Sequence, residues 1–219
     1  MFAFSPQRPP LPASLVATMR PATMAATKQL PVESPWSTLL PERGLRRGST
    51  VTVVGTVGSG LVTLAFSLLG EVTQRGYWLG LVGLDDSGVV AMREAGIDLS
   101  RTLFLPRPRD AWAEATADLF DGIDVVVLRP PGRASHAVAR RLTARAKERG
   151  AVLVVITEPH VTWPVPADLT IDISDPRWSA TAHRLQRSVE VRITGRGAAR
   201  RTSTTRLGLP GPSGRVEVL

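Results

Sequence analysis

The chain has 219 residues, 43% of them hydrophobic and 21% charged, an ordinary composition for one globular domain with tails. It contains no cysteine, which excludes disulfides, thiolate metal sites and cysteine nucleophiles; its three histidines lie on unrelated segments, so we expect no metal site. No apolar run approaches the roughly 18 residues that span a bilayer, and the proline-rich start is unlike a secretory signal. We therefore expect a cytoplasmic protein.

The net charge of +8 is concentrated in the two flanks of the chain. Residues 1–49 carry a net charge of +4 and residues 176–219 a net charge of +7, whereas residues 50–175 carry −3. Basic flanks attract nucleic acid or an acidic protein surface. However, the chain has 25 arginines and only two lysines. A genome rich in G and C produces such an excess of arginine even where the charge has no function. Both interpretations stay open.

The N-terminal part of the chain is rich in Pro, Ser, Thr and Ala and lacks sustained periodicity, which is typical of a segment that does not fold alone. We assign residues 1–40 to a flexible N-terminal arm and residues 41–219 to a single domain. Within the arm, the apolar side chains of Leu30, Val32 and Trp36 form a candidate segment for docking on a protein partner.

From residue 50 onward the sequence alternates between short apolar or β-branched runs and longer segments with helical periodicity. The strands expected here are Thr50–Gly55, Trp78–Gly83, Leu103–Leu105, Val125–Leu128 and Ala151–Thr157. The helices expected between them are Ser59–Gln74, Gly88–Ala95, Ala111–Phe120 and Ala134–Arg149. This alternation predicts a central, mainly parallel sheet flanked by helices.

Residues 167–219 follow a different pattern, with half-exposed strands joined by glycine-rich and proline-rich turns. The strands expected in this part are Leu169–Ile173, Ser188–Thr194, Thr204–Leu209 and Arg215–Leu219. They predict a C-terminal antiparallel β-meander added to one side of the parallel sheet. The predicted fold class is therefore α/β, with a C-terminal antiparallel extension.

The segment Gly55–Thr63 lies between the first strand and the first helix, the position of a phosphate-binding loop of pattern GxxxxGK[ST]. The residues that keep this loop glycine-rich are Gly55, Gly58, Ser59 and Gly60. The lysine position is occupied by Leu61 and the hydroxyl position by Val62. Because the lysine meets the β- and γ-phosphates and the hydroxyl binds magnesium, we expect no ordered Mg·ATP.

A further loss affects the strand Val125–Leu128, which in a nucleotidase of this architecture ends in an aspartate that helps to hold the metal. Here the strand runs into Arg129, which inverts the charge of the site. The three losses predict a protein that is not an enzyme, with no catalytic residue and no cofactor. A dinucleotide-binding loop is disfavoured, because its pattern is GxGxxG and this loop has GxxGxG.

Five segments in this order and spacing resemble the core of the RecA superfamily. These segments are residues 50–74, 81–85, 96–106, 122–128 and 154–158, and the resemblance covers about residues 45–195. It implies a RecA-like core in the predicted α/β domain. Within the superfamily the chain is similar to the shortened RecA-like mutagenesis accessory proteins of actinobacteria, the ImuA′ family, through residues 124–133, 140–155 and 189–199.

The ImuA′ resemblance implies a catalytically inactive adaptor in DNA-damage-induced (SOS) mutagenesis and translesion synthesis. It implies a protein partner of the ImuB type, a relative of the Y-family polymerases. The same complex would include an error-prone replicative-type polymerase, and the protein would be associated with the nucleoid when active.

Residue by residue, the RecA-type catalytic glutamate falls on Asp85, a shorter carboxylate. The glutamine that senses the γ-phosphate falls on Glu158, which has the opposite hydrogen-bonding polarity. The segment Pro159–Ala167 stands where RecA carries a long DNA-binding loop, and it is far shorter. We therefore expect no RecA-style grip on DNA.

Three other surfaces are candidates for contacts. A group of arginines in the C-terminal meander could meet DNA or an acidic partner: Arg192, Arg196, Arg200, Arg201 and Arg206. No aromatic residue is interleaved with them, so base stacking is not expected. The arginine stripe 141, 145 and 149 is typical of a solvated helix face. Trp163 and Trp178 border the shortened loop and belong either to a protein contact or to the core.

Two alternatives stand beside the adaptor hypothesis. The first is a nucleotide-binding regulator that does not hydrolyse ATP, for which Mg·ATP would raise the melting temperature. The second is a single-strand DNA-binding module that uses the arginines of the meander, for which affinity would fall steeply with salt.

Overall fold

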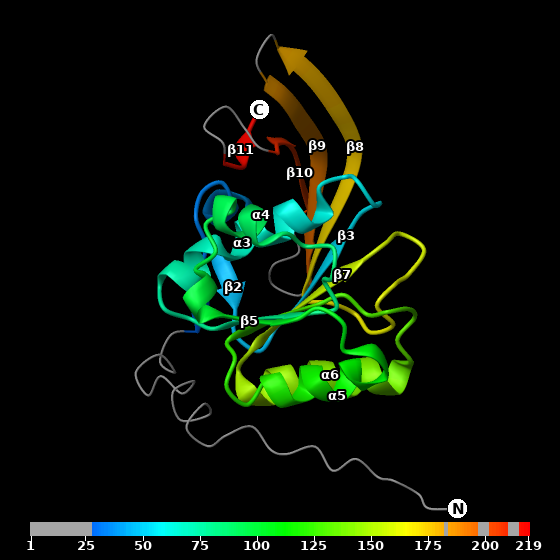
Figure 1. Cartoon of the computed structure of the whole chain (residues 1–219). Coiled ribbons are helices and arrows are strands. Elements are labelled where there is room, and N and C mark those ends of the chain that lie inside the picture. Colours follow the sequence, from blue (N-terminus) through cyan, green and yellow to red (C-terminus); the bar gives the residue numbers. More distant parts are fainter. Residues whose placement is uncertain (1–27, 182–183, 197–201, 210–214) are drawn as a thin grey trace, which may run out of the picture.

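The computed structural model describes residues 28–181, 184–196, 202–209 and 215–219. These residues form a nine-stranded sheet with helices on both faces and a separate two-stranded sheet (Figure 1). The strand order in the large sheet is β11-β10-β9-β8-β3-β7-β6-β4-β5. The arrangement confirms the predicted fold class, a mainly parallel α/β sheet with a C-terminal antiparallel extension.

The parallel part of the sheet consists of β3 (Thr50–Val54), β4 (Leu79–Val82), β5 (Thr102–Leu105), β6 (Val125–Leu128), β7 (Val152–Thr157) and the start of β8 (Leu169–Thr181). The antiparallel part adds β9 (Arg184–Gly195), β10 (Thr202–Gly208) and β11 (Glu217–Val218) to β8. The helices that follow β3 along the chain are α3 (Leu61–Gln74), α4 (Val89–Glu94), α5 (Trp112–Leu119) and α6 (His136–Arg149), with short 3-10 turns η1 (Leu99–Arg101) and η2 (Arg109–Ala111).

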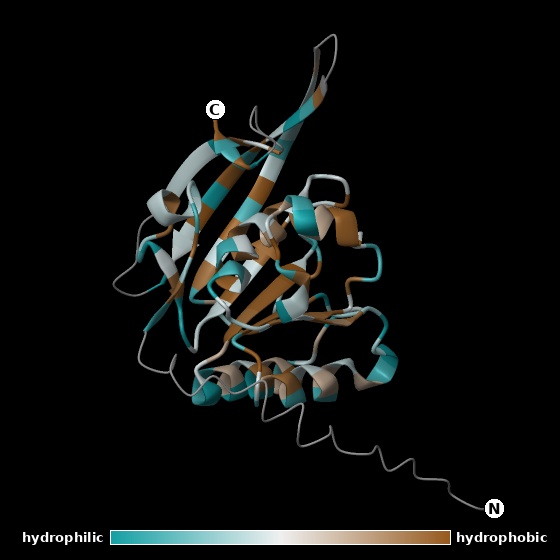
Figure 2. Cartoon of the chain, turned by 60° about the vertical axis from the view of Figure 1, so that its left-hand side comes forward, coloured by the Kyte–Doolittle hydropathy of each residue, from teal (hydrophilic) through white to brown (hydrophobic). Residues whose placement is uncertain are grey.

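Helices cover both faces of the parallel strands, which is why these strands read as continuous apolar runs. Along β7, Val154 and Ile156 point to the face that α3 covers, whereas Leu153 and Val155 join the cluster beneath α5 and α6. The hydropathy colouring of Figure 2 shows mostly brown strands in the middle of the sheet and a mixture of teal, white and brown along the helices that flank it. Within the described ranges, none of the helices has both the length and the apolar character needed to cross a bilayer.

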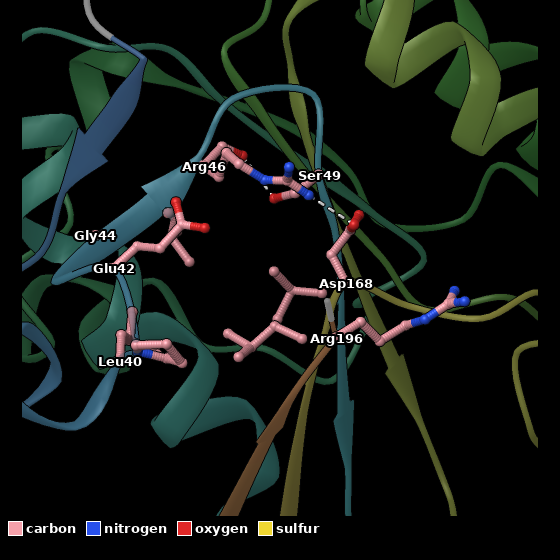
Figure 3. A pocket seen from close by; sticks show the side chains of 11 residues that line it. Leu40, Glu42, Gly44, Arg46, Ser49, Asp168 and Arg196 are labelled. Carbon is pink, nitrogen blue, oxygen red and sulfur yellow. Dashed lines mark hydrogen bonds and ion pairs between the residues drawn. The ribbon is translucent and has the colours of Figure 1, made fainter. Parts of the chain in front are cut away.

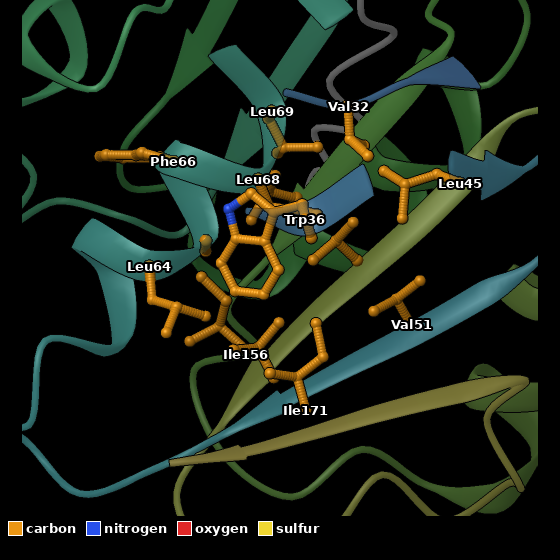
Figure 4. Packing of buried hydrophobic residues seen from close by; sticks show 14 of the residues in the cluster. Val32, Trp36, Leu45, Val51, Leu64, Phe66, Leu68, Leu69, Ile156 and Ile171 are labelled. Carbon is orange, nitrogen blue, oxygen red and sulfur yellow. The ribbon is translucent and has the colours of Figure 1, made fainter. Parts of the chain in front are cut away.

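The N-terminal boundary differs from the predicted arm of residues 1–40. Residues 29–46 fold as β1 (Gln29–Pro31), α2 (Trp36–Leu39) and β2 (Gly44–Arg46), and the two strands pair as a small antiparallel sheet. Leu30, Val32 and Trp36 are buried in the same core cluster as the apolar side chains of α3. Figure 4 shows Val32 and Trp36 in this cluster, and the Trp36 Nε1 donates a hydrogen bond to Ser67 Oγ at 3.1 Å. This segment is part of the domain because its apolar side chains complete the core. Residues 1–27 of the predicted arm lie outside the described residues.

The C-terminal extension also differs from the prediction, since β8 and β9 are 13 and 12 residues long and continue well past the predicted strands. A shift in register between Ser174 and Arg177 marks a β-bulge in β8. The bulge and Pro176 interrupt the alternation of apolar residues, which hides the second half of the strand from a reading of the sequence. As a result the β8–β9 hairpin projects beyond the body of the molecule (Figure 1).

We predict that Trp36→Ala lowers the free energy of unfolding by about 3–5 kcal/mol, because it leaves a large cavity beneath α3 and removes the hydrogen bond that the indole donates to Ser67. Trp178→Ala is the matched control: this tryptophan is 58% exposed, and we expect a loss below about 1 kcal/mol. Urea unfolding followed by circular dichroism measures both. Equal losses in the two variants would contradict the assignment of Trp36 to the core.

Candidate functional site

The glycine-rich loop lies at the carboxyl end of β3 and leads directly into α3. Its backbone turns through the left-handed region at Gly58 (φ +81°) and at Gly60 (φ +93°), the residue before the helix. Gly55 anchors the loop to the neighbouring strand by donating its N–H to the Thr157 carbonyl oxygen at 3.2 Å. The chain therefore retains the backbone shape of a phosphate-binding turn at the start of a 14-residue helix.

The two residues that replace the lysine and the hydroxyl are part of the apolar packing. Leu61 is buried in the cluster that α3 shares with the sheet, and Val62 packs against the same cluster. Ser59 is also buried, and its hydroxyl has no hydrogen-bond partner among the described residues. The start of the helix thus supplies neither a side-chain cation nor an oxygen ligand at the two positions where a nucleotide needs them.

A residue that sequence reasoning missed, Arg187, lies against the loop. It extends from β9, and its Nη1 donates a hydrogen bond to the Gly58 carbonyl oxygen at 3.0 Å. A Cβ atom added to Gly60 would lie 2.7 Å from the Arg187 Nη2, so the guanidinium is packed directly on that glycine. The guanidinium also stacks on Trp178, 5.2 Å from the ring centroid. Burial lowers the pKa of Arg187 from its usual value.

On the opposite side of the loop, Arg129 follows β6 as predicted and turns its guanidinium toward Asp86. The Nη1 atom and the Asp86 Oδ1 atom are 2.6 Å apart. Asp85, the counterpart of the catalytic glutamate, is paired with Arg107 at 3.2 Å. Arginine side chains thus neutralise both of the carboxylates that follow β4.

A cavity of about 340 Å³ lies between the loop and the end of β6. Six of the nine predicted site residues line it: Gly58, Gly60, Leu61, Val62, Arg129 and Glu158. Arg187 and Asp86 line it as well. Gly55, Ser59 and Asp85 do not; Ser59 is buried beneath the loop, and the carboxylate of Asp85 is directed to Arg107.

The residues around this cavity do not fit Mg·ATP. Magnesium prefers carboxylate, hydroxyl and water oxygens in an octahedral arrangement. The carboxylate of Asp86 already accepts a hydrogen bond from Arg129, and the position next to Gly60 is filled by the guanidinium of Arg187. Among the residues that the structure describes, no group of three or more histidine, aspartate or glutamate side chains is placed to hold a metal ion.

The other predicted contact residues are dispersed over the molecule. Leu30, Val32 and Trp36 are buried in the core of this chain and are not exposed to a partner. Trp163 is buried beneath the sheet, whereas Trp178 is exposed on the β8–β9 hairpin.

The described arginines of the meander differ in how available they are for a contact. Arg192 and Arg196 are exposed, whereas Arg206 is held in an ion pair with Asp175. Arg200 and Arg201 lie outside the described residues. On α6, the arginines 145 and 149 of the predicted stripe both contact Asp121, at 2.8 and 3.0 Å.

A second cavity, of about 450 Å³, lies at the amino ends of β3 and β8 (Figure 3). Its charged side chains have structural roles: Asp168 pairs with Arg46 at 2.7 Å and accepts the Thr50 N–H at 2.9 Å. Glu42 accepts a hydrogen bond from Gln29. Asp168 therefore fastens the pair of strands β1 and β2, the N-terminal hairpin, to the amino ends of β3 and β8 in the middle of the large sheet.

The fold and the loop define a RecA-like α/β protein. The KaiC-like protein PH0186 from Pyrococcus horikoshii, which has this fold, aligns with a TM-score of 0.61 over 88% of this chain and 98% of that structure. The sequence identity of 17% means that this likeness shows the fold alone. Residues 38–165 match the family model of the MT3502 N-terminal domain, and the chain belongs to that family.

A curated relative is the uncharacterized protein Rv3395c of Mycobacterium tuberculosis, with 42% identity over 104 residues. The match covers 46% of this chain, and the chain spans about half the length of that relative.

We predict that Arg187→Ala loosens the loop, because the variant loses a charged hydrogen bond to the Gly58 carbonyl that is worth about 1.5–3 kcal/mol. Amide hydrogen exchange in a peptide spanning residues 56–62 should become faster. Arg192→Ala, on the opposite face of β9, is the matched control and should leave this exchange unchanged. The same exchange rate in wild type and Arg187→Ala would show that the contact does not hold the loop.

Proposed function

We propose that this chain is a catalytically inactive RecA-like adaptor in DNA-damage-induced (SOS) mutagenesis and translesion synthesis. Its partner is a relative of the Y-family polymerases of the ImuB type, in a complex that includes an error-prone replicative-type polymerase. The observation that carries the proposal is the state of the loop: Leu61 and Val62 replace the nucleotide ligands, and Arg187 lies where phosphate would approach Gly60.

The charges around the loop support an inactive protein. An ATPase of this fold needs a free carboxylate near the metal and a carboxylate that activates water. In this chain Asp86 is paired with Arg129 and Asp85 with Arg107. Both would have to break ion pairs before they could act. A protein that keeps the RecA-like fold without this chemistry is suited to present surfaces to other proteins.

The assignment to mutagenesis rests on the sequence resemblance to the ImuA′ family. The segments that carry it lie on elements of the folded domain: residues 124–133 cover β6 and the turn with Arg129, and residues 140–155 cover most of α6 and β7. The short segment between β7 and β8 fits an adaptor as well, because it leaves no long loop at the position where RecA grips DNA.

We predict that the wild-type protein binds Mg·ATP more weakly than about 1 mM, which corresponds to less than about 4 kcal/mol of binding free energy. The physical reason is that the loop offers backbone N–H groups and a helix dipole but no lysine and no magnesium ligand. Isothermal titration calorimetry with the purified full chain measures this directly.

The control for that titration restores the missing groups: Leu61→Lys, Val62→Thr and Arg129→Asp, combined with Arg187→Ala to uncover Gly60. We expect measurable Mg·ATP binding only in this variant, with its fold checked by circular dichroism. Micromolar binding by the wild type would overturn the proposal. It would favour the nucleotide-binding regulator, the second candidate, which is suggested by the cavity of about 340 Å³ that persists beside the loop.

A further inference from the structure

The outer half of the β8–β9 hairpin has no neighbouring strand on either side among the described residues. The pairing of β3 with β8 ends at Val54 and Asp172, and the pairing of β10 with β9 ends at Gly208 and Ser188. Beyond those points lie residues 175–181 and 184–187, within which residues 178–181 pair with residues 184–187; the carbonyl oxygen of Arg187 also accepts the Leu209 N–H at 2.7 Å. We call this two-stranded part the distal ribbon. It is the element that projects from the body of the molecule in Figure 1.

One face of the distal ribbon is apolar. In the antiparallel register Trp178 lies opposite Arg187, and Ala180 lies opposite Leu185, so these four side chains share a face. Trp178 is 58% exposed and Leu185 is 62% exposed. We call Trp178, Ala180 and Leu185 the apolar ridge. The other face carries polar residues, Ser179 opposite Gln186.

The apolar ridge continues the pattern that builds the core. Along β9, the side chains of Val189 and Val191 are buried on the α3 side of the sheet, and Arg187 and Leu185 follow them at the same two-residue period. Within the body this face is covered by α3 and the N-terminal hairpin; past Arg187 the described residues provide no cover. An apolar ribbon face that extends beyond its own core is typical of an interaction site.

The distal ribbon is also held in a fixed position. Arg187 ties its base to the loop through the Gly58 carbonyl, and it stacks on Trp178. On β8, at the base of the ribbon, Asp175 pairs with Arg177 and with Arg206 of β10, and these two guanidiniums hold the pKa of Asp175 below its usual value. A two-stranded ribbon is only marginally stable by itself. These contacts preorganise the ridge and reduce the entropy that a partner must overcome to bind it.

The surroundings of Trp178 favour a protein over a nucleic acid. Binding of a single strand would need free guanidiniums beside the stacking indole. The two described guanidiniums nearby are engaged, Arg177 with Asp175 and Arg187 with the Gly58 carbonyl. The exposed tryptophan and leucine remain available as anchors, and such side chains dominate the energetics of protein interfaces. Residues 175–187 nevertheless carry three arginines and one aspartate, a net positive charge.

We infer that the apolar ridge docks into an apolar cleft with an acidic rim on a protein partner. The inference rests on the proposed function and identifies that partner as the Y-family-like polymerase relative. The ridge is convex and narrow, so it requires a concave partner surface. The net positive charge of the ribbon is complementary to carboxylates around that surface, which favours the correct orientation.

The test is the affinity of the purified full chain for the purified polymerase relative, measured by biolayer interferometry. Trp178→Ala and Leu185→Ser should each weaken binding at least about tenfold, because each removes an anchor from the centre of the contact. Leu185→Ser leaves the Arg187–Trp178 stack in place. It therefore tests the ridge without changing the contact of Arg187 with the loop. Gln186→Ala, on the polar face of the same ribbon, is the matched control and should change the affinity less than about twofold.

The outcomes separate the ridge from the proposed function. Wild-type affinity in Leu185→Ser, with tight binding by the wild type, would overturn the ridge and leave the adaptor role intact. Absence of binding by the wild type would overturn both the adaptor role and the partner assigned to the ridge. A parallel titration with a single-stranded oligonucleotide completes the test: wild-type binding that is lost in Trp178→Ala would assign the ridge to nucleic acid and overturn the protein partner.

Discussion

The guanidinium of Arg187 links the two parts of the molecule that set its chemistry. It reaches from β9 to a carbonyl of the glycine-rich loop, and its Cα lies on the strand that continues into the distal ribbon. This contact explains why residue 60 must be glycine, and the explanation differs from the one that applies to a phosphate-binding loop. In such a loop the missing side chain lets a phosphate approach the backbone. Here it gives room to an arginine of the same chain.

Arginine side chains surround the loop at the carboxyl ends of the parallel strands. Parallel α/β sheets place ligand-binding residues at the carboxyl ends of their strands. At those ends this chain has Arg129 with Asp86, Arg107 with Asp85, and Arg187 on the loop. Each arginine contacts a group of this chain that could otherwise face a nucleotide or a metal. Exposed ion pairs of this kind contribute little stability, about 0–1 kcal/mol each. Their consequence is that the carboxylates are neutralised.

The sequence is sufficient to predict the parallel core because each strand from β3 to β7 is a short apolar or β-branched run with a glycine or proline within two residues of its end. The losses at Leu61 and Val62 follow from the spacing of the loop motif, and the loss at Arg129 follows from its position after β6. The contact of Arg187 with the loop could not be predicted from the sequence, because Arg187 is 129 residues from Gly58 and no motif relates the two. The small sheet of β1 and β2 was missed because two three-residue strands, one ending in proline and the other in arginine, are too short to carry a periodic signal.

Strand β8 pairs in parallel with β3 and in antiparallel with β9. The middle of the sheet can therefore form only after strands that lie far along the chain are available. The carboxylate of Asp168, just before β8, accepts the N–H of Thr50 across 118 residues. During synthesis, β3 must therefore wait with an open edge until β8, about 118 residues further along the chain, has left the ribosome. Contacts over such separations form slowly, and unpaired strand edges in the meantime invite aggregation. The parallel core of this domain is thus closed late, when the β8–β9 hairpin pairs with the first strand of the large sheet.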